Sequence, residues 1–327
     1  MNATVPTLAV TPEPPFMDLL VATKTQVATD VWCFELRHPQ GQALPPFTAG
    51  SHLTVQTPSG ARRNYSLCSD PADTGSYQIA VKRDAQGRGG SISMVDDVHA
   101  ADMLSASVPR NNFALHPRAD EFLFIAGGIG ITPILSMMRE LRHGGRAKFR
   151  LVYCTRDAAS TAFRELLQSE FAGQLLLHHD HGDLDQAIDL WPEFETPSRT
   201  QVYCCGPRGL MDAVADMSGH WPTEAIHFES FGVDASRYAA NVPFTVRLNR
   251  SGASVPVSAD QSILEVLRAA GLQLPSSCES GTCGSCRTTL ISGAVEHRDM
   301  VLLDEEKSHQ IMVCVSRGCG GELVLDL

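Results

Sequence analysis

Cys278-Glu279-Ser280-Gly281-Thr282-Cys283-Gly284-Ser285-Cys286 is the stretch around which this sequence is organised. Its cysteines follow a C-x4-C-x2-C pattern, the plant-type spacing for a [2Fe–2S] cluster. Gly281 and Gly284 let the backbone wrap closely around a ligand. The short side chains of Ser280, Thr282 and Ser285 leave backbone N–H groups free to point at the sulfur atoms. Such hydrogen bonds tune the potential of a cluster. The stretch therefore predicts an iron–sulfur site.

A [2Fe–2S] cluster needs four thiolates, and two later cysteines are candidates for the fourth. Cys314 lies in the apolar, strand-like run 312–315, whereas Cys319 lies in a glycine-rich turn. Because a rigid strand holds a ligand better than a turn does, we choose Cys314. Structural zinc sites are usually built from pairs of short C-x2-4-C units, which this spacing fits poorly. Disulfides are not expected without a secretory signal. The predicted ligands are Cys278, Cys283, Cys286 and Cys314.

The composition indicates a globular protein of two or three domains, because a single core rarely grows to 327 residues. The net charge of −11 argues against a nucleic-acid partner. No apolar run reaches the length of a membrane span. The N-terminus lacks the basic and apolar regions of a signal peptide. Ten cysteines without an export signal then predict a cytoplasmic protein.

Short strands separated by turns characterise residues 17–117, a pattern that is typical of a closed antiparallel barrel or a sandwich. Within this region, Arg62-Arg63-Asn64-Tyr65-Ser66 combines guanidinium groups, an aromatic ring and a hydroxyl, which suit a ligand with a planar ring and a phosphate. On a strand, Arg63 and Tyr65 share one face and Ser66 points to the other. The same residues also fit an ordinary solvated strand. The predicted strands are Met17–Lys24, Asp30–Arg37, Ser51–Thr57, Tyr65–Ser69 and Tyr77–Lys82.

A second chemical signal follows the last of these strands. Gly87-Arg88-Gly89-Gly90-Ser91 leads into a short helix, and we expect Ser91 to be its N-cap. Glycines before a helix N-terminus form an anion site, and Arg88 would add a forked phosphate donor. By itself such a run more often indicates a plain loop. It gains weight because a cluster motif occurs in the same chain.

The middle of the chain begins with the buried-strand run 121–126, followed by Gly127-Gly128-Ile129-Gly130-Ile131-Thr132-Pro133 and a helical pattern. Pro133 suits the first turn of a helix. A strand, glycine loop and helix in this order start a nucleotide-binding α/β domain. The match to G-x-G-x-x-G is partial, because Pro133 stands where the last glycine would be.

Strands and helices alternate from there to residue 231, which predicts a parallel sheet with right-handed crossovers. Ligands bind such sheets at the carboxyl ends of the strands, where Thr155–Asp157 and Cys205–Pro207 fall. Asp157 would favour NAD by accepting from a ribose hydroxyl, and Arg156 would favour NADP by pairing a 2′-phosphate; residue chemistry leaves both open. The predicted strands are Lys148–Cys154, Gln174–His179, Gln201–Cys205 and Ala225–Phe231, and the predicted helices are Ala162–Phe171, Leu184–Leu190 and Leu210–Met217.

These motifs together resemble a known family. The runs 63–66, 127–133 and 205–207 resemble the ferredoxin–NADP reductase superfamily. With the glycine run 87–91 and the C-terminal cysteine motif, the chain is similar to the phthalate dioxygenase reductase family, whose order of motifs vanillate demethylase reductases share. The resemblance extends from about residue 16 to Leu327.

The resemblance implies FMN as the flavin, NADH as the donor and a Rieske-type oxygenase of aromatic catabolism as the acceptor. It places Ser66 near the reactive edge of the flavin, Thr132 near flavin and nicotinamide, and Cys205 at the nicotinamide end. Phe231 would cover the flavin. The implied flavin-binding residues are Arg63, Tyr65, Ser66, Val81, Lys82, Arg88, Gly89, Gly90 and Ser91. The implied nucleotide-binding residues are Gly127, Gly128, Gly130, Thr132, Asp157, Cys205, Gly206 and Pro207.

The resulting expectation is a multidomain electron-transfer enzyme. It has a disordered lead-in (1–15), an FMN-binding antiparallel β-barrel (16–118), an NAD-binding α/β domain with a parallel sheet (119–232), a linker (233–241) and an α+β β-grasp ferredoxin domain (242–327). A flavin converts a two-electron donor into one-electron steps, and its partner complex should be transient. Two alternatives stay open: an NAD(P)H oxidoreductase that reduces a small molecule without an oxygenase, and a non-catalytic iron–sulfur scaffold or sensor.

Overall fold

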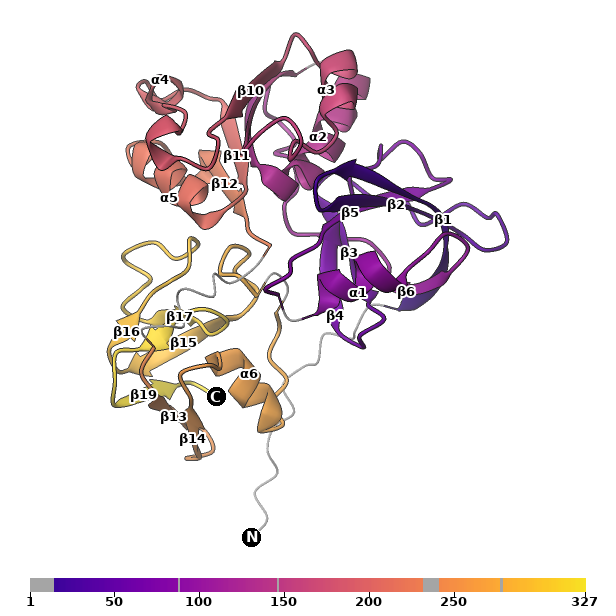
Figure 1. Ribbon diagram of the computed structural model, residues 1–327. Coiled ribbons are helices and arrows are strands. Elements are labelled where there is room, and N and C mark those ends of the chain that lie inside the picture. The colour runs from indigo at the N-terminus through magenta and orange to yellow at the C-terminus, as the bar shows by residue number, and fades with distance from the viewer. Residues whose placement is uncertain (1–14, 88, 146, 232–240, 277–278) are drawn as a thin grey trace. The chain divides into compact units, whose positions relative to one another are not determined.

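The computed structural model describes residues 15–87, 89–145, 147–231, 241–276 and 279–327. The described chain divides after Glu229 into two compact units. The first unit holds a β-barrel and a parallel α/β sheet, and the second holds the cysteine motif (Figure 1). Two predicted ligand residues, Arg88 and Cys278, lie outside the described residues, as do most of the predicted lead-in and linker.

The barrel is an antiparallel sheet in the order β4-β3-β6-β1-β2-β5, with β7 pairing β3. Leu67, directly after β4, bridges Ile79 on β5, so the two ends of the sheet meet. Apolar side chains alternate into the interior, including Leu19 and Val21 of β1. The elements are β1 (Phe16–Ala28), β2 (Val31–Arg37), β3 (Ser51–Gln56), β4 (Arg62–Ser66), β5 (Tyr77–Lys82), α1 (Gly90–Asp97), β6 (Met103–Ser107) and β7 (Arg110–Asn111).

The second half of this unit is a fully parallel sheet in the order β10-β9-β8-β11-β12. Helix α2 buries Ile131, Ile134, Leu135 and Met138 at helical spacing. The elements are β8 (Glu121–Gly127), η1 (Gly128–Gly130), α2 (Ile131–Gly144), β9 (Lys148–Thr155), α3 (Arg164–Glu170), β10 (Leu175–His179), η2 (Leu184–Gln186), α4 (Trp191–Phe194), β11 (Gln201–Cys205), α5 (Arg208–Met217), η3 (Thr223–Ala225) and β12 (Ile226–Glu229).

Helix α2 packs directly against the barrel. Barrel residues Ala49 and Cys68 share one apolar core with the α/β sheet. Arg139 Nη1 donates to Cys68 O at 2.8 Å, and Glu140 Oε2 accepts from Ala49 N at 2.8 Å. These contacts hold the barrel and the sheet together as one packed body within the first unit.

The second unit is a mixed sheet in the order β14-β13-β19-β15-β17 with helix α6 packed on it. Ser262 and Glu265 form a capping box at the start of α6. Only the β13–β19 pair in this sheet is parallel among the described residues, an arrangement that matches the predicted β-grasp. The elements are β13 (Phe244–Leu248), β14 (Ser254–Val257), α6 (Ile263–Ala269), β15 (Arg287–Ser292), β16 (Val295–Glu296), β17 (Gln310–Met312), β18 (Arg317–Gly318) and β19 (Glu322–Leu325).

Two predicted elements, one helix and one strand, were wrong. The segment 184–190 forms only the 3-10 turn η2, because Asp183 and Asp189 bind backbone N–H groups of Asp185 and Trp191 and compete with a helix. The strand predicted over 312–315 ends at Met312, whose carbonyl accepts from the N–H groups of the following turn. Cys314 therefore lies in a turn and not in a strand.

None of the helices in the described ranges is long and apolar enough to cross a membrane.

Candidate functional site

Strand β4 and the start of helix α1 bring most of the predicted flavin residues together. A Cβ on Gly90 would lie 3.0 Å from the Arg63 side chain, so the two predicted segments are in contact. The residue at the N-cap of α1 is Gly89, in the left-handed region, and none of the described side chains caps the helix. The predicted cap Ser91 lies inside the helix instead, where its hydroxyl accepts from Asp84 N. The first N–H groups of α1 remain available to an anion.

The hydroxyl of Tyr65 indicates that a ligand binds beside β4. Its hydroxyl is buried and has no hydrogen-bond partner among the described residues, whereas buried polar groups nearly always have one. Burial raises the pKa of Tyr65 to about 12, so the hydroxyl stays a donor near neutral pH. A phosphate or ring oxygen of a bound flavin would supply the missing acceptor.

Val81 and Lys82 differ in which of their atoms can reach a bound flavin. The Val81 side chain is buried in the barrel core, so only its backbone can reach a ligand. Lys82, the last residue of β5, is exposed.

A carboxylate that the sequence analysis assigned no role lies beside Ser66. The Ser66 hydroxyl donates to Glu229 Oε2 at 3.2 Å. Glu229 ends β12 and pairs in register with Cys205, the last residue of β11. Burial and the nearby Glu229 charge hold the pKa of Cys205 well above its usual range, so Cys205 is a neutral thiol. The sequence signal that points to Glu229 is its place at the carboxyl end of a parallel strand.

The glycine loop after β8 approaches the end of β11 closely. A Cβ on Gly130 would lie 2.0 Å from Cys205 O, and one on Gly127 would lie 2.5 Å from the Pro207 ring. The predicted residues Gly127, Gly130, Cys205, Gly206 and Pro207 therefore meet at one point. Gly128 has φ 52° and open space around its missing Cβ, which leaves its backbone accessible to a ligand.

Thr132 comes just after this loop in the chain, and Asp157 follows β9, the strand that pairs with β8. Thr132 is buried, and its hydroxyl donates to Ile129 O at 3.1 Å within the loop. The Asp157 carboxylate accepts from Ser160 N at 2.8 Å. Hydrogen bonds from Ser160 lower the pKa of Asp157, which is therefore ionised and able to accept from a ribose hydroxyl.

In the second unit, Gly281 and Gly284 adopt left-handed conformations in the cysteine loop. A Cβ on Gly281 would lie 2.7 Å from Val315 Cγ2, so the loop packs against the turn that carries Cys314. Cys286 and Cys314 are both buried and Cys283 is half-buried, whereas Cys319 is exposed. The structure thus brings three of the predicted ligands to adjoining segments of one unit and leaves Cys319 at the surface.

Among the described residues, which exclude Cys278, no three Cys, His, Asp or Glu side chains form a group that could hold a single metal ion. This arrangement is compatible with a [2Fe–2S] cluster, because its four thiolates are divided between two iron atoms. Phe231, predicted to cover the flavin, is 44% exposed and belongs to the second unit, so that role stays a prediction.

Three family models match successive parts of the chain. Residues 18–115 match an oxidoreductase FAD-binding domain, residues 124–174 an oxidoreductase NAD-binding domain, and residues 246–319 a 2Fe-2S iron-sulfur cluster binding domain. These matches confirm the predicted order of a flavin barrel, a nucleotide-binding sheet and a cluster domain.

Two relatives are similar over almost the whole chain. The phthalate 4,5-dioxygenase oxygenase reductase subunit of Pseudomonas putida is 59% identical over 95% of this chain and 97% of its own length. The phthalate dioxygenase reductase of Burkholderia cepacia is 57% identical over 95% of this chain and 98% of its own. A solved structure of phthalate dioxygenase reductase, described as modular for electron transfer from pyridine nucleotides to [2Fe-2S], aligns with a TM-score of 0.75 at 56% identity, covering 95% of this chain and 98% of that one.

Proposed function

Because the chain belongs to the phthalate dioxygenase reductase family, we propose that it is the reductase component of a Rieske-type oxygenase system. It is an NADH-dependent flavin and iron–sulfur oxidoreductase. In the proposed system it passes electrons from NADH through FMN and a [2Fe–2S] cluster to the oxygenase. It works in the cytoplasm, where NADH is supplied, and meets its partner transiently.

The observation that carries this proposal is the meeting of the flavin and nucleotide segments in one packed unit. Ser66 of the barrel contacts Glu229 at the end of the parallel sheet, and Cys205 lies on the neighbouring strand. A flavin ring beside β4 and a nicotinamide at the ends of β11 and β12 would thus face each other. The flavin supplies the conversion of one hydride into single electrons when it is bound.

The chain's own residues orient and shield these groups. The buried Cys205 thiol is neutral, so it is not a thiolate nucleophile. It can pack against a bound group and donate a weak S–H hydrogen bond. Ser66 offers a hydroxyl held by Glu229. Arg63, Gly90 and the first N–H groups of α1 suit one terminal phosphate, which is the reason to propose FMN as the flavin.

Asp157 supports NADH over NADPH, because an ionised carboxylate accepts from a ribose hydroxyl and repels a 2′-phosphate. Asp157→Asn keeps an oxygen for Ser160 N and removes only the charge. We expect the ratio of kcat/KM for NADH to that for NADPH to be above one in the unmodified protein and to fall in Asp157→Asn. A ratio of one or less in the unmodified protein would mean that Arg156 dominates.

The proposal is tested by mixing the purified chain with a Rieske-type oxygenase encoded near it and adding NADH anaerobically. Reduction of the oxygenase should be visible in its absorbance spectrum, and acid extraction of the reductase should release FMN. Recovery of FAD contradicts the phosphate assignment. If NADH bleaches the flavin but the electrons pass to a small molecule and to no oxygenase, the result supports the alternative, an NAD(P)H oxidoreductase without an oxygenase partner.

A further inference from the structure

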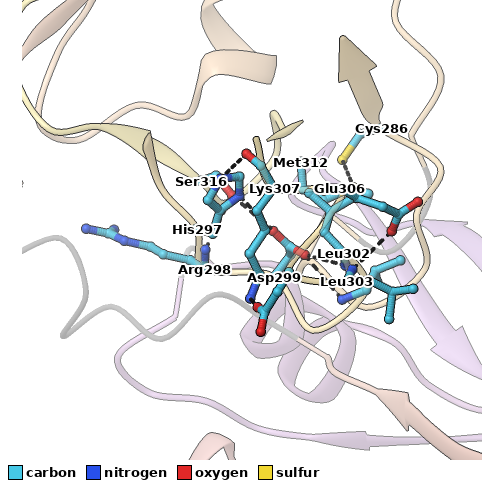
Figure 2. Close-up of polar contacts among 12 residues, drawn as sticks. Cys286, His297, Arg298, Asp299, Leu302, Leu303, Glu306, Lys307, Met312 and Ser316 are labelled. Atoms are coloured by element: carbon cyan, nitrogen blue, oxygen red, sulfur yellow. Dashed lines mark hydrogen bonds and ion pairs between the residues drawn. The ribbon is translucent and has the colours of Figure 1, made fainter. Parts of the chain in front are cut away.

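Asp299 is a buried carboxylate that none of the proposed cofactor sites uses. Its side chain is fully buried. Oδ2 accepts from the backbone N–H groups of Val301 at 3.2 Å and Leu302 at 2.8 Å, and Oδ1 lies 3.4 Å from the Ser316 hydroxyl. Figure 2 shows Leu302 and Ser316 beside the Asp299 side chain. Burying a charged group is costly, so its position calls for an explanation.

This carboxylate lies between the two cysteine-bearing segments. The N–H of the next residue, Met300, donates to Gly281 O at 3.0 Å in the cysteine loop. A Cβ on Gly281 would lie 3.1 Å from the Asp299 Cα. On the other side, Ser316 follows closely after Cys314 in the chain. An electron arriving on a cluster held by these segments would therefore add negative charge next to a negative charge that is already buried.

His297 faces the carboxylate with an unused nitrogen. Its Nε2 is 3.0 Å from Lys307 O, and since a carbonyl only accepts, Nε2 carries a hydrogen. Its Nδ1 lies 3.7 Å from Asp299 Oδ1, is buried and has no hydrogen-bond partner in the part of the chain that the structure describes. The ring is 14% exposed, so protons can reach it from solvent. A proton on Nδ1 would turn two facing acceptors into an ion pair.

The other charged groups around His297 already have partners. Glu296 and Arg298 pair with each other at 2.7 Å, and Lys307 pairs with Asp304 at 2.7 Å. Glu306 pairs with Arg287, and Arg317, opposite Glu296 on β18, donates to backbone carbonyls. Within the described ranges, His297 is the only basic side chain at ion-pair distance from Asp299.

We propose that His297 and Asp299 form a redox-linked proton site, an inference that rests on the [2Fe–2S] cluster of the proposed function. Reduction of a bound cluster by one electron would then be accompanied by the uptake of one proton from solvent at His297 Nδ1. One charge of each sign enters the same buried region, so its net charge is unchanged. This compensation matters because charge interactions are strong where water is excluded.

Linkage between proton binding and reduction determines whether the reduction potential rises or falls with pH. If the reduced state binds the proton more tightly, acid favours reduction, so the reduction potential falls as pH rises. Where neither redox state binds the proton, the potential is level. A tenfold difference in proton affinity between the two states corresponds to about 59 mV for one electron.

The test is a redox titration of the full-length protein, followed by the EPR signal of the reduced cluster, at several values from about pH 5 to 8, where imidazoles change charge. His297→Gln keeps a donor for Lys307 O and cannot be protonated. We expect a falling potential in the unmodified protein and a level one in His297→Gln, equal to the unmodified alkaline value. The exposed His309, in the same unit, provides the matched control: His309→Gln should retain the slope.

Asp299→Asn provides a second test of the proton site. Its amide oxygen can still accept from Leu302 N, while the negative charge is lost. Its potential should be higher, and the sloping range should move to lower pH. A purely structural role would damage the cluster signal without moving the slope. A slope that persists in His297→Gln, or a level potential in the unmodified protein, overturns this inference alone. Absence of a cluster signal in the unmodified protein overturns the proposed function, and this inference with it.

Discussion

Among single residues, Gly130 decides how closely the nucleotide loop approaches β11. A Cβ there would meet backbone atoms of Cys205 at 2.0 Å, and backbone cannot move aside as a flexible side chain can. Gly130→Ala should therefore cost about 1–3 kcal/mol of stability, in the range of other overpacking changes, and weaken NADH binding. Urea unfolding and an NADH titration measure the two effects.

The control for this change is Gly144, the last residue of α2, which has nothing within 4 Å of its missing Cβ. Gly144→Ala should be neutral or stabilise by up to about 1 kcal/mol, because alanine restricts the unfolded chain. Equal losses in both variants would show that the close approach at Gly130 is unimportant.

A second prediction about single residues concerns which cysteine is the fourth cluster ligand. Cys314 is 4% exposed beside the cysteine loop, while Cys319 is exposed. Cys314→Ser should abolish most of the visible absorbance and the EPR signal of the cluster, because the ligand must be a thiolate. Cys319→Ser should leave both intact. The reverse pattern would transfer the assignment to Cys319.

At the scale of elements, strand β12 contains a histidine that should make folding sensitive to acid. His227 stacks on Tyr203 with ring centroids 4.3 Å apart, and its Nε2 lies 2.9 Å from Gln201 Oε1. Burial, with a smaller contribution from His116, lowers the pKa of His227 from 6.5 to about 4. Between these values the unfolded chain binds the proton and the folded chain does not, so stability falls as pH decreases.

His227→Gln should remove this part of the acid sensitivity. We expect the loss of stability between pH 6.5 and about 4 to be smaller in the variant than in the unmodified protein. Urea unfolding at several pH values measures it. The exposed His220 provides a control, since His220→Gln should keep the unmodified pH profile. An unchanged profile in His227→Gln would contradict the prediction.

At the scale of the whole molecule, the division after Glu229 separates the flavin and nucleotide segments from the cysteine unit. Each unit has apolar cores of its own. A chain truncated after Gly232 should therefore still bind FMN and be reduced by NADH, as followed by flavin absorbance. It should pass few electrons to cytochrome c or an oxygenase, because it lacks the cluster. Full electron transfer by the truncated chain would rule out the linear route.

The sequence by itself determined the three kinds of domain and the family. Alternating short strands, a glycine loop between a strand and a helix, and the cysteine spacing are local patterns, and local backbone preferences act within a few residues. The predicted fold class is confirmed for that reason. Local patterns are insufficient where side chains compete with the backbone. Asp183, for example, binds the N–H of Asp185 at the start of the predicted helix 184–190.

Only the tertiary structure decided which distant residues meet. Ser66 and Glu229 are 163 positions apart and touch because the barrel packs on the parallel sheet through α2. His297 and Asp299 acquire significance only once the cysteine loop and the Cys314 turn pack around them. Such contacts depend on how whole elements bury their apolar faces against one another, and no periodicity within a single segment encodes that packing.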